Sequence, residues 1–301
     1  MHEIQLFGTV EVRTRGVRLS GRDFGGVKPR HILTLLALRG ALHKGELAEL
    51  LWEAGPPANH VATLESYVSV LRHRLDPRST VRDSVICTRN GGYALDLERV
   101  RVDVNRFDEL IAAAAGRTPA RAVPPLTAAV RLAGGPLLED EAGPAWAAQA
   151  RERYRVRLVE ALLTAAEHAL TAGEPQAALE LSARAVATEP MAERGWYVRM
   201  AAHRAAGDRV SALRAYDRCR RLLADGLGVQ PSPLIRGLFL ELLREEGSGT
   251  GVDGAVAAVL AAAQELGAGS GGWSELSGHT VVHLLRRATE LAGRPILDPA
   301  A

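Results

Sequence analysis

The first 100 residues combine two hydrophobic periodicities. Residues 1–20 carry apolar side chains at alternate positions, with Gly8 and Gly16 as breaks, which is typical of short antiparallel strands. Residues 28–75 follow the helical period, and residues 81–97 return to the strand period around a Gly-Gly pair. The pattern therefore predicts strands, then helices, then a β-hairpin.

The third predicted helix, residues 60–75, has the most informative pattern. Its apolar side chains recur at i, i+4, i+7 and i+11 and form one narrow row that faces the core. At about 100° per residue, a second set of side chains points away from the core, and arginines flank this outward set. Short polar side chains let a helix backbone approach base edges in a major groove, and arginine reaches guanine or phosphate; an ordinary solvated helix face would have the same pattern. The inward row is Leu64, Val68, Leu71 and Leu75, the outward set is Ser66, Ser69, Val70 and His73, and the arginines are Arg72 and Arg74, with Arg78 and Arg82 just beyond.

The segment after this helix predicts a hairpin with a basic tip. Two apolar strands within residues 86–97 surround an Arg-Asn-Gly-Gly sequence that begins at Arg89 and favours a tight turn. An arginine at such a tip can enter a minor groove or contact phosphate. Before the helix, a loop at residues 53–59 contains two prolines and ends at Asn59, the expected helix N-cap. The order helix, helix, loop, helix, basic-tipped hairpin is that of a winged helix-turn-helix.

Residues 104–246 are predicted to be helical and contain an internal repeat. An offset of 34 residues places Gly173 on Gly207 and Ala178 on Ala212. Each glycine is expected to separate two helices, and each alanine to let them approach closely. This period is similar to that of the tetratricopeptide repeat, in which one unit cannot bury its own apolar face and neighbours must stack.

The pattern divides the chain into three parts. Residues 1–100 form the predicted winged helix-turn-helix domain, and residues 104–246 form the helical repeats. The third part, residues 247–301, opens with GSGTGVDG, which has the composition of a flexible linker, and continues with an Ala-rich helical extension. Its two amphipathic stretches favour a helical pair that caps the repeats, or else a role in dimerisation or effector sensing.

Several segments resemble one family. TRNGGY, from Thr88 to Tyr93, resembles the wing of the OmpR-like winged-helix domains. TLESYVSVLRHRL, from Thr63 to Leu75, resembles the recognition helix of the SARP family, pathway-specific activators of actinobacterial antibiotic gene clusters. GPLLED at 135–140 and LGVQPSP at 227–233 are similar to the bacterial transcriptional activator domain that follows the winged helix in those proteins. Family members usually carry a basic residue where this chain has Val70.

The resemblance implies a mainly α protein, with an N-terminal winged helix-turn-helix (α+β) followed by a tetratricopeptide-like α-helical solenoid. It also implies binding to direct repeats in double-stranded promoter DNA, self-association there, and recruitment of RNA polymerase holoenzyme through its sigma factor and alpha C-terminal domain. In related activators the loop corresponding to Trp52, Glu53 and Pro56 contacts the polymerase. The expected DNA contacts are Thr63, Ser66, Ser69, Val70, Arg72, His73, Arg74, Arg89 and Asn90.

Charge and composition reduce the number of functional classes to which the protein can belong. Residues 1–100 hold 14 basic and 11 acidic side chains, whereas the remainder holds 23 and 24, so the positive excess lies in the predicted DNA-binding part. No nucleophile elbow, Walker loop, dinucleotide fingerprint or zinc motif is present, so neither an enzyme nor a cofactor is expected. No apolar run of eighteen residues and no secretory signal are found, and the two cysteines fit a reducing compartment, which predicts a cytoplasmic, nucleoid-associated protein without membrane contact.

Two alternatives remain open at the level of the sequence. One is a helical-repeat scaffold that binds proteins, with the first domain as an adaptor. The other is a ligand-gated repressor whose C-terminal extension forms the ligand pocket. The operator, the controlled pathway, any sensed ligand and the number of subunits do not follow from the residues.

Overall fold

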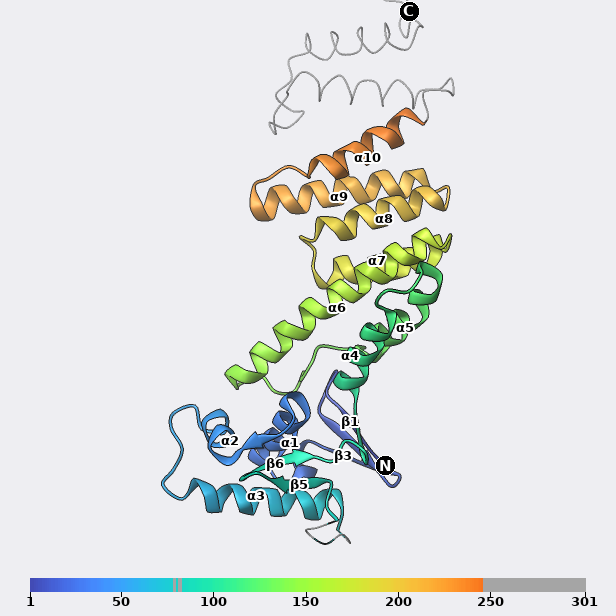
Figure 1. Cartoon of the computed structure of the whole chain (residues 1–301). Coiled ribbons are helices and arrows are strands. Elements are labelled where there is room, and N and C mark those ends of the chain that lie inside the picture. Colours follow the sequence, from blue (N-terminus) through green and yellow to red (C-terminus); the bar gives the residue numbers. More distant parts are fainter. Residues whose placement is uncertain (78–79, 81–82, 246–301) are drawn as a thin grey trace, which may run out of the picture. The chain divides into compact units, whose positions relative to one another are not determined.

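The computed structural model describes residues 1–77, 80 and 83–245 (Figure 1). The predicted extension at 247–301, together with Arg78 and Arg82, lies outside the described residues. The chain divides into two compact units, the first spanning Met1–Ala172 and the second beginning at Gly173.

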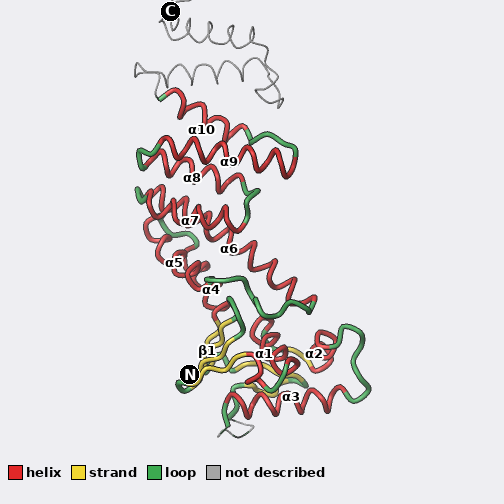
Figure 2. The backbone as a smooth tube through the Cα atoms, turned by 180° about the vertical axis from the view of Figure 1, so that it is seen from behind, coloured by secondary structure: helices red, strands yellow, loops and turns green. Residues whose placement is uncertain are grey.

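The first unit opens with a four-stranded sheet in the order β3-β2-β1-β7, drawn in yellow in Figure 2. The first three strands form an antiparallel meander, as the alternation in residues 1–20 predicted. The fourth pairs parallel with β1, so that His2 lies opposite Val100. The strands are β1 (His2–Gln5), β2 (Glu11–Thr14), β3 (Val17–Ser20) and β7 (Val100–Val102).

Three helices and a second sheet complete a winged helix-turn-helix, which confirms the predicted order. The second sheet has the strand order β4-β6-β5, and β5 and β6 form the hairpin. A short 3-10 helix, η1, leads from β3 towards the first α-helix. The elements are η1 (Gly21–Phe24), α1 (Val27–Arg39), β4 (Leu42–His43), α2 (Lys44–Leu51), α3 (His60–Leu75), β5 (Ile86–Arg89) and β6 (Gly92–Leu95).

Helix α3 buries the row that its periodicity predicted. Leu64, Val68 and Leu71 are fully buried, and Leu75 is 2% exposed. The helix packs against α1, α2 and η1. Asn59 occupies the N-cap position, although the observed contact there runs from the Thr63 hydroxyl to the Asn59 carbonyl oxygen at 3.1 Å. Because one side of α3 is fixed in the core, the opposite side is directed outward.

Helices α4 (Asp103–Ala114), α5 (Pro119–Leu132) and α6 (Ala145–Thr171) extend the first unit, with α5 packed between the other two. The start of α4 is tied to the sheet, because Asp103 Oδ2 accepts the backbone N–H groups of Leu6 and Phe7, each at 2.8 Å. Burial raises the pKa of Asp103, although these backbone hydrogen bonds act to lower it. The sheet and α4 are therefore held as one body.

A buried ionic cluster joins α1 to the segment before α6. The carboxylate of Glu141 accepts a hydrogen bond from Arg30 Nε, and its Oε2 lies 2.8 Å from His31 Nε2. Arg151 of α6 donates to the backbone oxygens of Leu138 and Glu141. Burial acts to raise the pKa of Glu141, but the hydrogen bonds from His31 and Arg30 outweigh it and hold this pKa below its usual value.

Glu141→Gln should reveal how much this cluster stabilises the fold. A carboxylate with a lowered pKa stabilises the folded state above its ordinary pKa of about 4.3, and the stabilisation is lost as the pH falls through the lower folded value. At pH 7 we expect the free energy of unfolding to drop by about 2–4 kcal/mol, because two buried donors lose their charged partner. Urea denaturation at pH 7 and below pH 4 measures both states.

The exposed neighbour Glu139→Gln is the matched control, with an expected change within about 0.5 kcal/mol. A Glu141→Gln deficit of equal size at both pH values would contradict the assigned role of the charge.

The second unit consists of stacked helices. Helix α8 packs against α7 and α9, and α10 packs against α8 and α9. Their shared core includes Trp196, Met200, Cys219 and Phe239, and the ring of Phe239 stacks on Tyr216 with the centroids 3.9 Å apart. The helices are α7 (Pro175–Thr188), α8 (Glu193–Ala205), α9 (Arg209–Leu227) and α10 (Pro233–Arg244).

The repeat predicted from the 34-residue offset is present. Gly173 and Gly207 adopt φ values of 80° and 75° at helix ends, a conformation that favours glycine. Ala178 and Ala212, the alanines matched by the same offset, are both fully buried. Burial also raises the pKa of the Cys219 thiol to about 12, so this cysteine is a packing residue and stays protonated at neutral pH.

Over residues 1–77, 80 and 83–245, no helix has both the length and the apolarity needed to cross a bilayer. Within the same ranges, no three His, Cys, Asp or Glu side chains are grouped so that they could hold a metal ion.

Candidate nucleic-acid interface

The outward side of α3 carries a row of small and polar side chains. Ala62, Ser66, Ser69 and His73 are all exposed, and they repeat the i, i+4, i+7, i+11 spacing of the buried row two positions earlier. Ala62 was not among the contacts predicted from the sequence, although its position four residues before Ser66 places it in the same row. The row offers hydroxyl and imidazole groups on a surface that a groove can approach closely.

Two other predicted contacts lie on the flanks of α3. Val70 is half-buried and faces η1, where a Cβ atom placed on Gly25 would lie 2.3 Å from Val70 Cγ1. Gly25 has a φ of 87°, so the chain passes close to α3 at a residue without a side chain. Thr63 is also half-buried, and its hydroxyl is engaged with Asn59. Both side chains therefore have contacts within the protein.

Arg72 connects α3 to the hairpin. Its Nε and Nη2 donate to the backbone oxygen of Ile86 at 3.1 and 2.8 Å, and Nη2 also donates to Thr88 Oγ1 at 2.9 Å. The guanidinium lies 5.8 Å from the ring centroid of Tyr93 in β6. Arg72 thus acts first as a positioning residue that holds the hairpin beside the helix.

The hairpin ends in a turn that presents Arg89 and Asn90 to solvent. Arg89 pairs with Gly92, and the two residues between them, Asn90 and Gly91, have φ values of 47° and 71°. Positive φ at both positions defines a type I′ turn, which matches the twist of paired strands. A Cβ on Gly91 would lie 2.9 Å from His43 Nε2, so a side chain there would crowd β4. Both tip side chains are exposed.

The charge on this surface is positive. Arg74 and Arg89 are exposed, and neither has an ion pair or side-chain hydrogen bond with another described residue. Glu65, the acidic residue within α3, is paired with Lys44, whose Nζ lies 2.6 Å from Oε1. The hydrogen bond to Glu65 raises the pKa of Lys44 and keeps it charged. The acid is therefore compensated, whereas the two arginines remain available to an anion.

The loop between α2 and α3 is partly engaged by the protein itself. The carboxylate of Glu53 accepts the backbone N–H of Ala145, the first residue of α6, at 2.7 Å. Trp52 is half-buried, with the ammonium of Lys28 5.9 Å from its ring centroid. Pro56 is exposed. Of the three residues predicted to contact polymerase, two are held at the base of the loop and one lies free.

Comparisons with known proteins agree with this architecture. Residues 102–243 match the family model of the bacterial transcriptional activator domain. Transcriptional regulator RedD of Streptomyces coelicolor is 32% identical over 258 residues, which cover 81% of this chain and 71% of RedD. Transcriptional regulatory protein MoaR1 of Mycobacterium tuberculosis is 27% identical, with coverage of 81% and 79%. The solved structure of Mycobacterium tuberculosis EmbR, in complex with a low affinity phosphopeptide, has a TM-score of 0.67 and 26% identity, and the match covers 91% of this chain and 72% of that one.

A winged helix-turn-helix followed by tetratricopeptide-like helices, with regulators as relatives, places the protein among transcriptional activators and not among enzymes. The chain belongs to the SARP family. The sequence resemblance to that family is thereby confirmed, as is the predicted fold class.

Arg72→Met should separate the positioning role of Arg72 from that of a free surface arginine. The substitution keeps the aliphatic stem but removes the hydrogen bonds to Ile86 and Thr88, so we expect a loss of about 2 kcal/mol in the free energy of unfolding. The matched variant Arg74→Met should change it by less than about 0.5 kcal/mol. Urea denaturation measures both, and equal effects would contradict the assignment.

Proposed function

We propose that this activator binds promoter DNA with α3 in a major groove and the β5–β6 tip against the neighbouring minor groove or its phosphates. The observation that carries the proposal is the exposed row of Ala62, Ser66, Ser69 and His73 opposite a fully buried row. A major groove is about 12 Å wide and admits one α-helix, whose short outward side chains then reach base edges.

The predicted contact residues divide into three roles under this proposal. Ser66, Ser69 and His73 address base edges, whereas Arg74, Arg89 and Asn90 contact phosphates or the minor groove. Arg72 positions the hairpin tip, because its guanidinium already donates hydrogen bonds to the Ile86 backbone oxygen and the Thr88 hydroxyl. Val70 sets the spacing between α3 and η1, and Thr63 stabilises the first turn of α3.

The wider proposal follows from the family. We infer that two or more copies bind direct repeats spaced by about one helical turn, so that neighbouring copies meet the same DNA face. There they recruit RNA polymerase holoenzyme through its sigma factor and alpha C-terminal domain, with Pro56 at the free part of the α2–α3 loop. The controlled genes form a secondary-metabolite cluster, and the protein acts in the cytoplasm on the nucleoid.

Arg89→Ala should weaken binding to every DNA sequence alike. A lost phosphate contact carries no sequence information, so affinity should fall about five- to tenfold, and the slope of log K against log salt should become shallower by about 1. His73→Ala should instead lower affinity for the specific site alone. Fluorescence anisotropy on specific and random duplexes between 50 and 200 mM salt measures both effects.

Arg117→Ala is the matched control for Arg89→Ala, because Arg117 is an exposed arginine on the α4–α5 connection. Binding by Arg89→Ala that equals that of this control at every salt concentration would contradict a role for the hairpin.

Pro56→Ala should uncouple activation from DNA binding. Pro56 is exposed, so the substitution should leave promoter affinity within about twofold while it loosens the loop that meets polymerase. Run-off transcription with purified holoenzyme should show fewer transcripts than with the wild-type protein. If the wild-type protein reduces transcription, the result favours the alternative of a repressor. If it binds no promoter DNA, the result favours the alternative of a protein-binding scaffold.

A further inference from the structure

A recess lies within the first unit where α1, the base of the α2–α3 loop and the start of α6 meet. It has a volume of about 410 Å³, within the range of about 300–1,000 Å³ that is usual for pockets that bind small molecules. Trp52 and Trp146 both line it, together with Lys28, His31, Glu53 and Pro144. The half-buried indole of Trp52 gives the recess a flat apolar wall, which suits a planar ring system.

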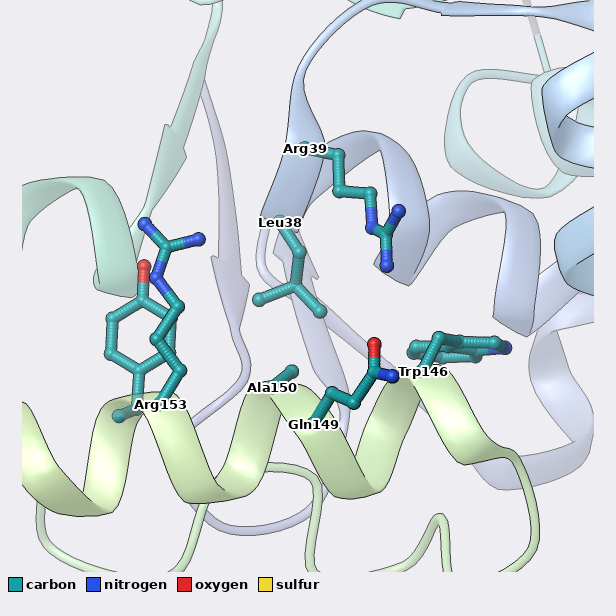
Figure 3. A pocket seen from close by; sticks show the side chains of 7 residues that line it. Leu38, Arg39, Trp146, Gln149, Ala150 and Arg153 are labelled. Carbon is teal, nitrogen blue, oxygen red and sulfur yellow. The ribbon is translucent and has the colours of Figure 1, made fainter.

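The indole N–H of Trp146 has no acceptor. Trp146 is 4% exposed, and its Nε1 is buried without a hydrogen-bond partner among the described residues. The same ring also borders a second, smaller recess lined by Leu38, Arg39, Gln149 and Arg153 (Figure 3). In that view the nitrogen edge of the ring points away from Arg39, so the smaller recess does not supply the acceptor. Because this nitrogen is already enclosed by protein, recognition of a ligand in the larger recess depends on Trp52 and Lys28.

The polar groups of the larger recess define the charge that it accepts. Lys28 contributes an ammonium group 5.9 Å from the Trp52 ring centroid, with one hydrogen bond, to the backbone oxygen of Leu51. An ammonium has three donors, so further donors remain for a ligand. The carboxylate of Glu53 is already engaged by Ala145 N–H, and His31 is engaged by Glu141. The Glu53 carboxylate keeps its charge when it accepts one hydrogen bond, so Lys28 is the group in this recess that supplies free donors to a ligand.

We propose that this recess binds a small planar aromatic carboxylic acid. Its ring system lies against Trp52 and Pro144, and its carboxylate pairs with Lys28. The binding site itself does not depend on the proposed DNA-binding function.

Its regulatory consequence rests on that function. Trp52 and Glu53 form the base of the loop assigned to polymerase contact, and Glu53 joins this loop to the first turn of α6. A ligand between them would bind one arrangement of the loop more tightly than another, and would therefore shift its population.

Isothermal titration of the full chain with 2-naphthoate tests the proposal. We expect saturable binding of one molecule per chain with a Kd of about 1 mM or tighter, the affinity that a ligand of this size reaches at ordinary efficiency. 2-Naphthylmethylamine and cyclohexanecarboxylate should bind at least about tenfold more weakly, since one has the wrong charge and the other has no flat ring. This comparison requires no variant, so it does not depend on any substitution being tolerated.

Variants then assign the binding to this recess. Trp52→Leu and Lys28→Met should each weaken 2-naphthoate binding at least about tenfold, because each removes one recognition element. Lys44→Met, which changes the other lysine of the chain, should leave that affinity unchanged.

Three outcomes would overturn the proposal. They are an absence of saturable binding up to 5 mM, equal binding of the amine, and binding that neither Trp52→Leu nor Lys28→Met weakens. Promoter binding measured on the same samples reports separately on the proposed DNA-binding function.

Discussion

The hydrogen bonds from the Arg72 guanidinium to Ile86 and Thr88 are the interactions on which the candidate nucleic-acid interface depends. The buried row of leucine and valine side chains fixes helix α3 against the core, and Arg72 joins the helix to the first strand of the hairpin. On the other flank of α3, Gly25 at the end of η1 lies close to Val70, and this contact fixes that flank. Because these contacts exist within the protein, the helix and the hairpin tip have a set spacing, and the proposed binding of DNA would require less ordering.

The sequence was most informative where a pattern is local. The spacing of Leu64, Val68, Leu71 and Leu75 predicted the buried side of α3, and the turn residues at Asn90 and Gly91 predicted the hairpin. The matching conformations of Gly173 and Gly207 followed from the 34-residue offset, since glycine positions at helix ends are set by short-range geometry.

Contacts between distant residues could not be predicted in the same way. Periodicity places Arg72 at the edge of an exposed face, but it does not show that the backbone oxygen of Ile86 lies within reach. The pairing of Glu141 with His31 spans 110 residues, and that of Glu53 with Ala145 spans 92. Strand β7 is three residues long and too short to show a period. These features depend on how the elements pack against one another. The residue pattern of a single sequence does not reveal that packing.

We propose that α3 and the hairpin tip contact one DNA site together. An iron chelate attached at Ser66→Cys or Asn90→Cys tests it, in a Cys87→Ser background in which the buried thiol of Cys219, with its pKa near 12, does not react. On promoter DNA from the protein's own gene neighbourhood, we expect the cleavages from the two positions to fall within about half a helical turn, roughly 5 base pairs. Cleavage from only one position, or from sites more than a full turn apart, would contradict it.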